Sequence, residues 1–243
     1  MVSHQSNLAN DVTDWLSPDE WQAVWLSLKV ASVATVCSLP FAVATAFALA
    51  RGRFWGRQLL DWIVHMPLIL PPVVTGFFLL MVFGRRGVVG EFLYDWFGIT
   101  IAFRWTGAAI AGAIMGFPLM VRAIRLAVEA VDRDLEDAAA TLGASRAWRF
   151  ALVTGPLIAP GIIVGAILGF AKAMAEFGAT ITFVSNIPGE TQTLPSAIYA
   201  FLQVPGGDEA ATRLVIISVV LAILALAISE WVSQWAAKRV SGR

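Results

Sequence analysis

Long apolar blocks are separated by polar segments along the chain. The apolar blocks cover residues 24–50, 61–83, 106–126, 157–175 and 212–235. A helix needs about 20 apolar residues to cross the hydrocarbon core of a bilayer, and each block is near or above that length. The pattern predicts an all-α, polytopic membrane protein of about five transmembrane helices. We expect one membrane domain over residues 17–237, with polar tails at 1–16 and 238–243.

The residues indicate where the first helix starts and where the second block breaks. Ser17, Pro18 and Glu20 predict a helix start, with serine as N-cap, proline in the first turn and glutamate completing a capping box. The second block contains three prolines between residues 67 and 72. Each proline lacks a backbone donor and crowds the preceding turn, so we expect a broken or kinked helix there.

Small residues recur at every fourth position in two blocks. The positions are Ala108, Gly112 and Gly116 in the third block and Gly161, Gly165 and Gly169 in the fourth. Glycine is frequent in membrane helices in general, but small residues on one helical face also let two backbones approach closely. We expect these faces to pack against other helices.

The composition agrees with a membrane protein. Only 14% of the residues are charged, against about 25% in a soluble domain, and the mean hydropathy is +0.74. The formal net charge is zero, so nothing favours nucleic acid as a partner. Cys37 is the one cysteine, which excludes a disulfide within the chain. The first 23 residues lack a basic region followed by a short apolar core, so we expect no cleavable signal peptide.

The distribution of basic residues predicts the orientation in the membrane. One side would carry Arg51, Arg53, Arg57, Arg122, Arg125, Arg133, Arg146, Arg149, Lys238, Arg239 and Arg243. The other side would carry Arg85, Arg86, Arg104 and Arg213, with Lys29 and Lys172 left in or near spans. Cytoplasmic connections carry the excess of basic residues, so the N-terminus is expected outside and the C-terminus inside.

Two connections on the outer side have unusual compositions. Arg85 and Arg86 precede an amphipathic stretch, residues 91–97, that suits the membrane interface. These arginines either anchor lipid headgroups or dock an acidic solute-binding protein. The connection 176–211 is too apolar for an aqueous loop, and irregular backbone at membrane depth occurs only where protein buries it or where it lines a cavity.

The apolar connection contains neutral hydroxyl and amide groups that suit an oxyanion pathway. The candidates for lining such a pathway are Thr180, Thr182, Ser185 and Asn186. Their other role would be to satisfy nearby backbone groups. Just before them, Lys172 and Glu176 lie four residues apart on one helical face, where they either neutralise each other or leave Lys172 to contact an anion.

Motifs for the common catalytic chemistries are absent from the sequence. The dipeptide Gly-Lys does not occur, so the chain has no P-loop for ATP. H-E-x-x-H and G-x-S-x-G are also absent. His65 has only His4 as a second histidine, so we expect a satisfied polar residue and no metal site. No catalytic residue is assigned, and if the chain takes part in active transport, the energy comes from another polypeptide.

A polar, alanine-rich segment, residues 134–156, separates the third and fourth blocks. Its first half predicts a helix that starts with acidic residues and ends before Gly143. Ser145 then suits the N-cap of a second helix. The segment is therefore expected to form a helix–glycine–helix knuckle on the basic, cytoplasmic side.

This knuckle resembles the EAA signature of ABC importer permeases, which reads E-A-A, three residues, G, nine residues, I-x-L-P. The matching positions of the coupling element are Asp137, Ala138, Ala139, Gly143 and Pro156, and the first four would enter the groove of the ATPase. The chain departs from the signature by Asp137 for Glu, Val153 for Ile and Gly155 for Leu, and the last change removes an apolar side chain. The resemblance implies the fold of type I importer permeases, with 134–156 as a cytoplasmic coupling helix pair.

A closer resemblance, from about residue 19 to the C-terminus, is to the molybdate permeases of bacterial ABC importers. It is carried by SLKVAS (27–32), HMPLILPPVVTG (65–76), GRRGVVGEFLYDWFGI (84–99), FPLMVRAIRLA (117–127), EFGATITFVSNIPGETQTLPSAIY (176–199) and ISEWVS (228–233). The resemblance implies two permease copies in the bacterial inner membrane, two cytoplasmic ATPase subunits that hold ATP and magnesium, and an external molybdate-binding protein.

The function expected from this resemblance is passage of molybdate by alternating access. A sulfate or tungstate permease is the alternative, because these oxyanions share shape and charge. A non-transporting membrane scaffold or an intramembrane enzyme is the remote alternative of another class. Solute-dependent stimulation of a partner ATPase distinguishes a permease from both.

Overall fold

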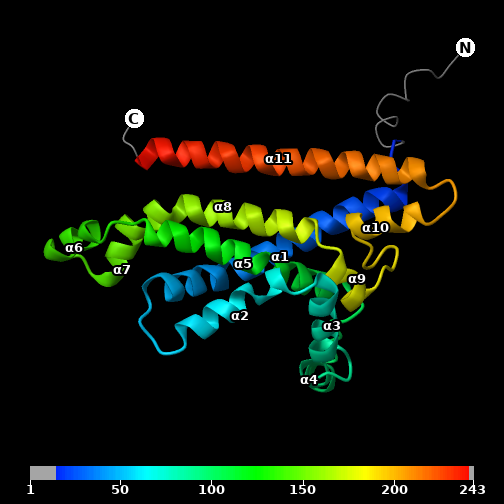
Figure 1. Ribbon diagram of the computed structural model, residues 1–243, viewed down its shortest axis with the longest axis horizontal. Coiled ribbons are helices and arrows are strands. Elements are labelled where there is room, and N and C mark those ends of the chain that lie inside the picture. Colours follow the sequence, from blue (N-terminus) through cyan, green and yellow to red (C-terminus); the bar gives the residue numbers. More distant parts are fainter. Residues whose placement is uncertain (1–14, 241–243) are drawn as a thin grey trace, which may run out of the picture.

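The computed structural model describes residues 15–240, and every element in this range is helical, as predicted (Figure 1). The helices are α1 (Pro18–Arg51), α2 (Arg57–Ile69), α3 (Pro72–Phe83), α4 (Val88–Phe97), α5 (Trp105–Glu129), α6 (Arg133–Thr141), α7 (Arg146–Arg149), the π-helix η1 (Phe150–Thr154), α8 (Gly155–Met174), α9 (Gly178–Val184), α10 (Leu194–Leu202) and α11 (Asp208–Val240). Most of the tail expected at 1–16, and residues 241–243, lie outside the described range. Helix α11 continues through 238–240, which we expected to belong to the other tail.

Four continuous helical segments are long and apolar enough to cross a membrane. They are α1, α5, the run from α7 through α8, and α11. The pair α2–α3 passes the same test together but bends by 115° between the two helices. The described residues therefore hold four candidate spans, or five if the bent pair is one span, in agreement with about five.

The break in the bent pair follows from its prolines. Leu70 has extended backbone, with φ −70° and ψ 141°, as expected for a residue that precedes a proline. Pro71 and Pro72 follow, and neither has an N–H to continue the helical ladder. Helix α3 consequently runs steeply away from the direction of α2 (Figure 1).

Helix α5 forms the centre of the bundle, with α1 and α8 packed along it. A Cβ built on Gly116 would lie 2.8 Å from the carbonyl oxygen of Gly169, and one on Gly112 would lie 3.1 Å from Ala173 Cβ. The small residues of α5 thus face those of α8, and the two backbones lie too close for larger side chains. The expectation that these faces pack against other helices is confirmed, and they pack against each other.

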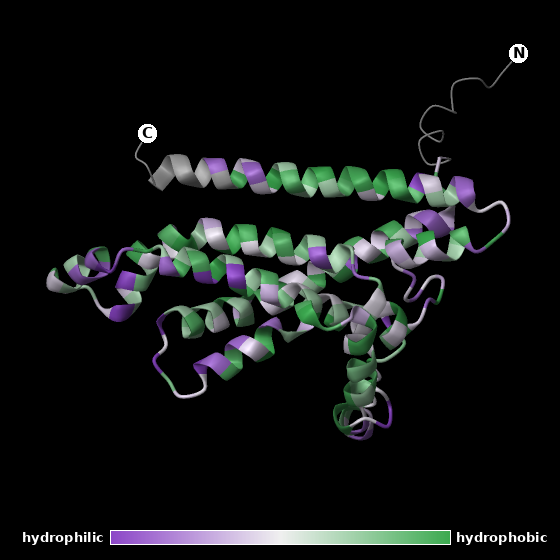
Figure 2. Ribbon diagram, in the orientation of Figure 1, coloured by the Kyte–Doolittle hydropathy of each residue, from purple (hydrophilic) through white to green (hydrophobic). Residues whose placement is uncertain are grey.

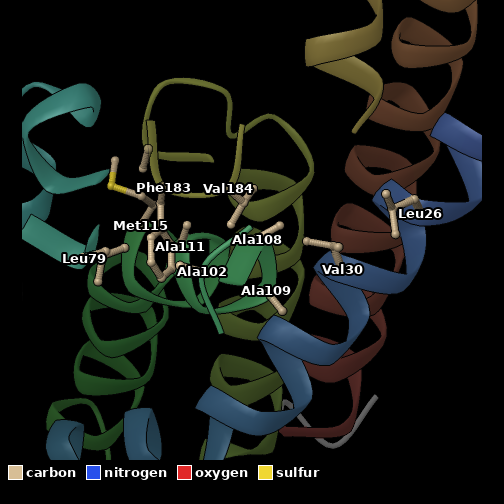
Figure 3. Packing of buried hydrophobic residues seen from close by; sticks show 11 residues of the cluster. Leu26, Val30, Leu79, Ala102, Ala108, Ala109, Ala111, Met115, Phe183 and Val184 are labelled. Atoms are coloured by element: carbon tan, nitrogen blue, oxygen red, sulfur yellow. The ribbon is translucent and has the colours of Figure 1, made fainter. Parts of the chain in front are cut away.

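One buried cluster joins α1, α3, α5 and α9 near one end of the bundle. Figure 3 shows Phe183 of α9 beside Met115 of α5, with Leu79 of α3 next to them and Val30 on α1. Phe183 is fully buried. The short helix α9 is therefore fixed in the protein interior between the longer helices.

The outer surface of the bundle is mostly apolar, as the hydropathy colours show (Figure 2). Helix α11 lies against α8 and α10, and few residues of its apolar part are buried. Its exposed side chains, such as Ile223 and Leu226, match a lipid environment. Hydrophilic residues gather in α6 and α7 and at the helix ends (Figure 2).

The first turn of α1 is attached to the first turns of α11 by a buried ion pair. Ser17 and Glu20 form the predicted capping box, in which the Glu20 carboxylate accepts a hydrogen bond from the Ser17 N–H. The same carboxylate lies 3.0 Å from Arg213 Nε and 2.9 Å from its Nη2. Glu20 is 0% exposed, so this charge has exchanged water for the guanidinium.

Candidate functional site

The knuckle consists of α6, the turn that follows it, and α7. Asp132 caps α6 by accepting from the Asp134 N–H at 3.0 Å, and α6 ends at Thr141. Gly143 then has φ +86°, the left-handed conformation that glycine adopts without strain. Ser145 caps α7 by accepting from the Trp148 N–H. The predicted helix–glycine–helix arrangement is confirmed, and Figure 1 shows it beyond the end of α5 and α8.

The knuckle presents signature positions and apolar side chains to its surroundings. Asp137, Ala138 and Gly143 are exposed, and Ala139 is half-buried. The turn brings Ala139 close to the residue after Gly143, since the Ala144 N–H donates to the Ala139 carbonyl at 3.1 Å. Pro156 is set apart in the first turn of α8, beyond η1.

Exposed apolar side chains surround these positions. Leu142 is 89% exposed, and Leu135 and Trp148 are also exposed. A small, protruding helix pair with uncovered apolar residues has the form of an element that inserts into a groove of another protein.

One residue of the knuckle, Glu136, points inward, although its place in the first turn of α6 indicates only an acid that suits a helix start. Glu136 Oε2 lies 2.5 Å from Nη1 of Arg51, the last residue of α1, and Glu136 Oε1 accepts a hydrogen bond from the hydroxyl of Thr154, the last residue of η1. The hydrogen bond from Arg51 is the main cause that lowers the pKa of Glu136 below its ordinary 4.5, and the Thr154 hydrogen bond and the charges of Arg51 and Arg149 add to it against partial burial. No signal along the sequence pairs residues 51 and 136.

The four proposed pathway residues lie in α9 and in the turn after it. Thr180 is buried, and the Thr182 hydroxyl donates to the Gly178 carbonyl at 2.9 Å. Ser185 has φ +66°, and Asn186 Nδ2 donates to the Ser196 carbonyl at 3.4 Å. Thr182 and Asn186 thus satisfy backbone groups in this conformation, which was the other role open to them.

The predicted pair of Lys172 and Glu176 is present. The ammonium nitrogen lies 3.2 Å from Glu176 Oε2. Glu176 Oε1 also accepts from the Ala179 N–H at 2.9 Å, which attaches α8 to the first turn of α9. Glu176 is only 2% exposed, so its charge is held by one lysine and one backbone donor.

Three further polar positions singled out in the sequence make contacts within the chain. Lys29 places its ammonium 3.8 Å from the ring centroid of Trp105, and Arg85 stacks its guanidinium 4.3 Å from that of Tyr94. His65 Nδ1 lies 2.9 Å from the Asp61 carbonyl oxygen. Among residues 15–240, no group of three His, Cys, Asp or Glu side chains is arranged to hold a metal ion.

Comparison with known families and proteins adds an independent finding. The family model described as "Binding-protein-dependent transport system inner membrane component" matches residues 38–241. The Molybdenum transport system permease protein ModB of Escherichia coli is 60% identical over 225 residues, which are 92% of this chain and 98% of that protein. ModB of Haemophilus influenzae is 50% identical over 91% of this chain and 96% of that protein. The Sulfate transport system permease protein CysT of Salmonella typhimurium is 35% identical over 77% of this chain and 67% of that protein.

Solved structures share the fold at low sequence identity. A crystal structure of a bacterial ABC transporter for the acidic polysaccharide alginate contains a chain with a TM-score of 0.70 and 18% identity, covering 95% of this chain and 83% of that one. A chain in the crystal structure of an amino acid ABC transporter has a TM-score of 0.60 and 16% identity, covering 96% of this chain and 99% of that one. These likenesses show that the helical bundle has the same fold as those chains.

Proposed function

The chain belongs to the family of binding-protein-dependent transport system inner membrane components, and we propose on this premise that it is the permease subunit of an ATP-driven molybdate importer. The observation that carries the proposal is the 60% identity to a molybdenum permease over 92% of the chain. The sulfate permease is only 35% identical over a shorter part, so molybdate is preferred to sulfate as the cargo. The chain itself is a multi-pass membrane protein and no catalyst.

The energy for transport comes from a separate ATPase chain that holds ATP and magnesium. Support comes from the knuckle, which offers exposed Asp137 and Gly143 beside uncovered Leu142 and Trp148. The signature positions Asp137, Ala138, Ala139, Gly143 and Pro156 form the contact with the ATPase or its immediate support. The ATPase is a dimer, so it engages two knuckles.

A second copy of this chain completes the membrane pore. The bent pair α2–α3 supports this, because it carries exposed aromatic residues such as Trp62, Phe77 and Phe78 away from the bundle. A molybdate-binding protein delivers the anion at the outer side. The charge asymmetry of the connections supports an external N-terminus and a cytoplasmic C-terminus, and α11 ends toward the same end of the bundle as the knuckle (Figure 1).

Transport proceeds by alternating access. Closure of the ATPase pair moves the two knuckles together, and the attached spans turn from inward-open to outward-open. Molybdate then crosses a path of neutral groups that includes α9, with Thr180, Thr182, Ser185 and Asn186 as lining candidates. Neutral donors suit a dianion that must be released, because conduction requires weak or multiple sites.

Reconstitution tests this function. The permease is placed in liposomes with its partner ATPase and a molybdate-binding protein, and molybdate uptake and ATP hydrolysis are measured together. We expect molybdate uptake to require ATP and the binding protein. Excess tungstate should inhibit this uptake more than excess sulfate does. Hydrolysis without solute-dependent stimulation would contradict the proposal, and preferential uptake of sulfate would replace the cargo while keeping the class.

A further inference from the structure

The knuckle helix α6 is held to the membrane helices by a single carboxylate. None of its residues is buried, so packing against the membrane helices contributes little to its position. Among the described residues, the side-chain hydrogen bonds of α6 that reach another element are those of Glu136, to Arg51 and Thr154. The other side-chain bonds of this helix stay within it or its own cap.

Each partner of Glu136 belongs to the end of a candidate span that lies beside the knuckle. Arg51 ends α1, which is 34 residues long. Thr154 ends η1, and α8 follows it without interruption. Short π-helical segments occur frequently at functional positions of otherwise regular helices. The carboxylate therefore lies where α6, α1 and α8 meet.

We propose that Glu136 is a positioning residue for transport, which fixes the coupling helix α6 to the ends of α1 and α8 so that movement of α6 reaches these two spans. This inference rests on the proposed function, because it takes the ATPase as the source of the movement. The contact with the ATPase itself remains assigned to the signature positions on the exposed side of α6.

The charges of Glu136 and Arg51 depend strongly on each other. Glu136 binds Arg51 and Thr154 with both carboxylate oxygens, and hydrogen bonds that involve a charged group are stronger than neutral ones. Arg51 reaches Glu136 through Nη1, whereas its Nη2 is buried and has no hydrogen-bond partner among the described residues. Loss of the carboxylate would leave this partly buried guanidinium without its counter-charge.

The test measures whether α6 and α1 move as one body. Spin labels are attached to Leu142→Cys after α6 and Ala44→Cys on the exposed side of α1, with Cys37→Ser as background, in the complex with the ATPase. We expect the distance between the labels to be the same without nucleotide and with trapped ATP. In Glu136→Gln and in Thr154→Val the distance should change when nucleotide binds.

The same variants are assayed in proteoliposomes for molybdate transported per ATP hydrolysed. We expect this ratio to fall about two- to thirty-fold, the range for a residue within a coupling network, while the permease still co-purifies with the ATPase. Arg53→Ala is the matched control, since Arg53 is an exposed arginine two residues beyond Arg51, and both readouts should stay at the wild-type value.

Three results would overturn the proposal. The first is a nucleotide-dependent distance change already present in the wild type, and the second is a normal transport ratio in both variants. The third is loss of both variants from the membrane, which would make the cluster a folding element. A wild-type complex that moves no molybdate would refute the proposed cargo instead, because the distance measurement needs only the ATPase and nucleotide.

Discussion

Replacing Glu20 by glutamine should weaken the fold much more than the same change at Glu209, although both carboxylates bind Arg213. Glu20 is fully buried, whereas Glu209 is 87% exposed at its side chain. Both lie 2.9 Å from a guanidinium nitrogen of Arg213. The two substitutions therefore compare a buried and an exposed ion pair with one shared partner.

The magnitude follows from the environment of each carboxylate. Removing one partner of a buried ion pair costs about 3–5 kcal/mol, and the partial exposure of Arg213 reduces this to about 2–3 kcal/mol. Glutamine also replaces one carboxylate oxygen by an N–H₂ group near the Ser17 N–H, which weakens the cap. An exposed pair such as that with Glu209 contributes less than about 1 kcal/mol. A difference of about 2 kcal/mol is about a 30-fold change in the unfolding equilibrium.

The measurement is a denaturant titration of the purified permease in detergent micelles. Trp21 and Trp25, which are exposed on the first turns of α1, report the transition by their fluorescence. We expect a clearly lower midpoint for Glu20→Gln and a near wild-type midpoint for Glu209→Gln. Equal midpoints for the two variants would refute the argument that burial gives this pair its strength.

Four further outcomes are expected. Gly143→Val should abolish uptake or uncouple it from ATP hydrolysis while the permease stays in the membrane, because the left-handed φ costs a non-glycine residue about 1–2 kcal/mol and a Cβ there meets no neighbour. Gly143→Asn should have a milder effect, and normal uptake in Gly143→Val would remove the coupling role. Lys172→Met and Glu176→Gln should each lower uptake, with the double variant milder than their sum in a double-mutant cycle, and additive losses would instead make Lys172 an anion contact. A cysteine at Ser145 should resist an impermeant thiol reagent applied to intact cells, and labelling from outside would reverse the orientation. The pKa of Glu136 is lowered in the folded state, so the contribution of its charge to stability is complete above pH 4.5 and is lost only as pH falls through the lower folded value. The mobility of a spin label on Leu142→Cys should therefore be unchanged between pH 7 and pH 5.

Contacts between residues close in sequence could be predicted because helix geometry fixes the partner. The capping box of Ser17 and Glu20 follows from a three-residue spacing, and the pair of Lys172 and Glu176 from a four-residue spacing. The left-handed Gly143 follows from its place between a helix end and a new cap. In each case the groups lie within about one helical turn, so local geometry brings them together, although for Lys172 an anion contact was also open.

The contacts that join distant parts of the chain could not be predicted in this way. Glu136 and Arg51 are 85 residues apart, and Glu20 and Arg213 are 193 residues apart. In the sequence both glutamates are ordinary acids in the first turn of a helix, which is where acids are favoured anyway. That local preference fully accounts for their presence, so it conceals their second partners.

For the pathway residues, the sequence leaves two roles open instead of concealing a contact. A hydroxyl in an apolar connection is compatible with a donor to an anion and with a bond to its own helix, and composition does not separate these roles. The structure gives Thr182 a local acceptor in Gly178, because helical geometry places that carbonyl one turn before the hydroxyl. The donor is thus occupied in this conformation by the backbone geometry of α9, and only a rotation of the side chain or of that helix would free it for a passing anion.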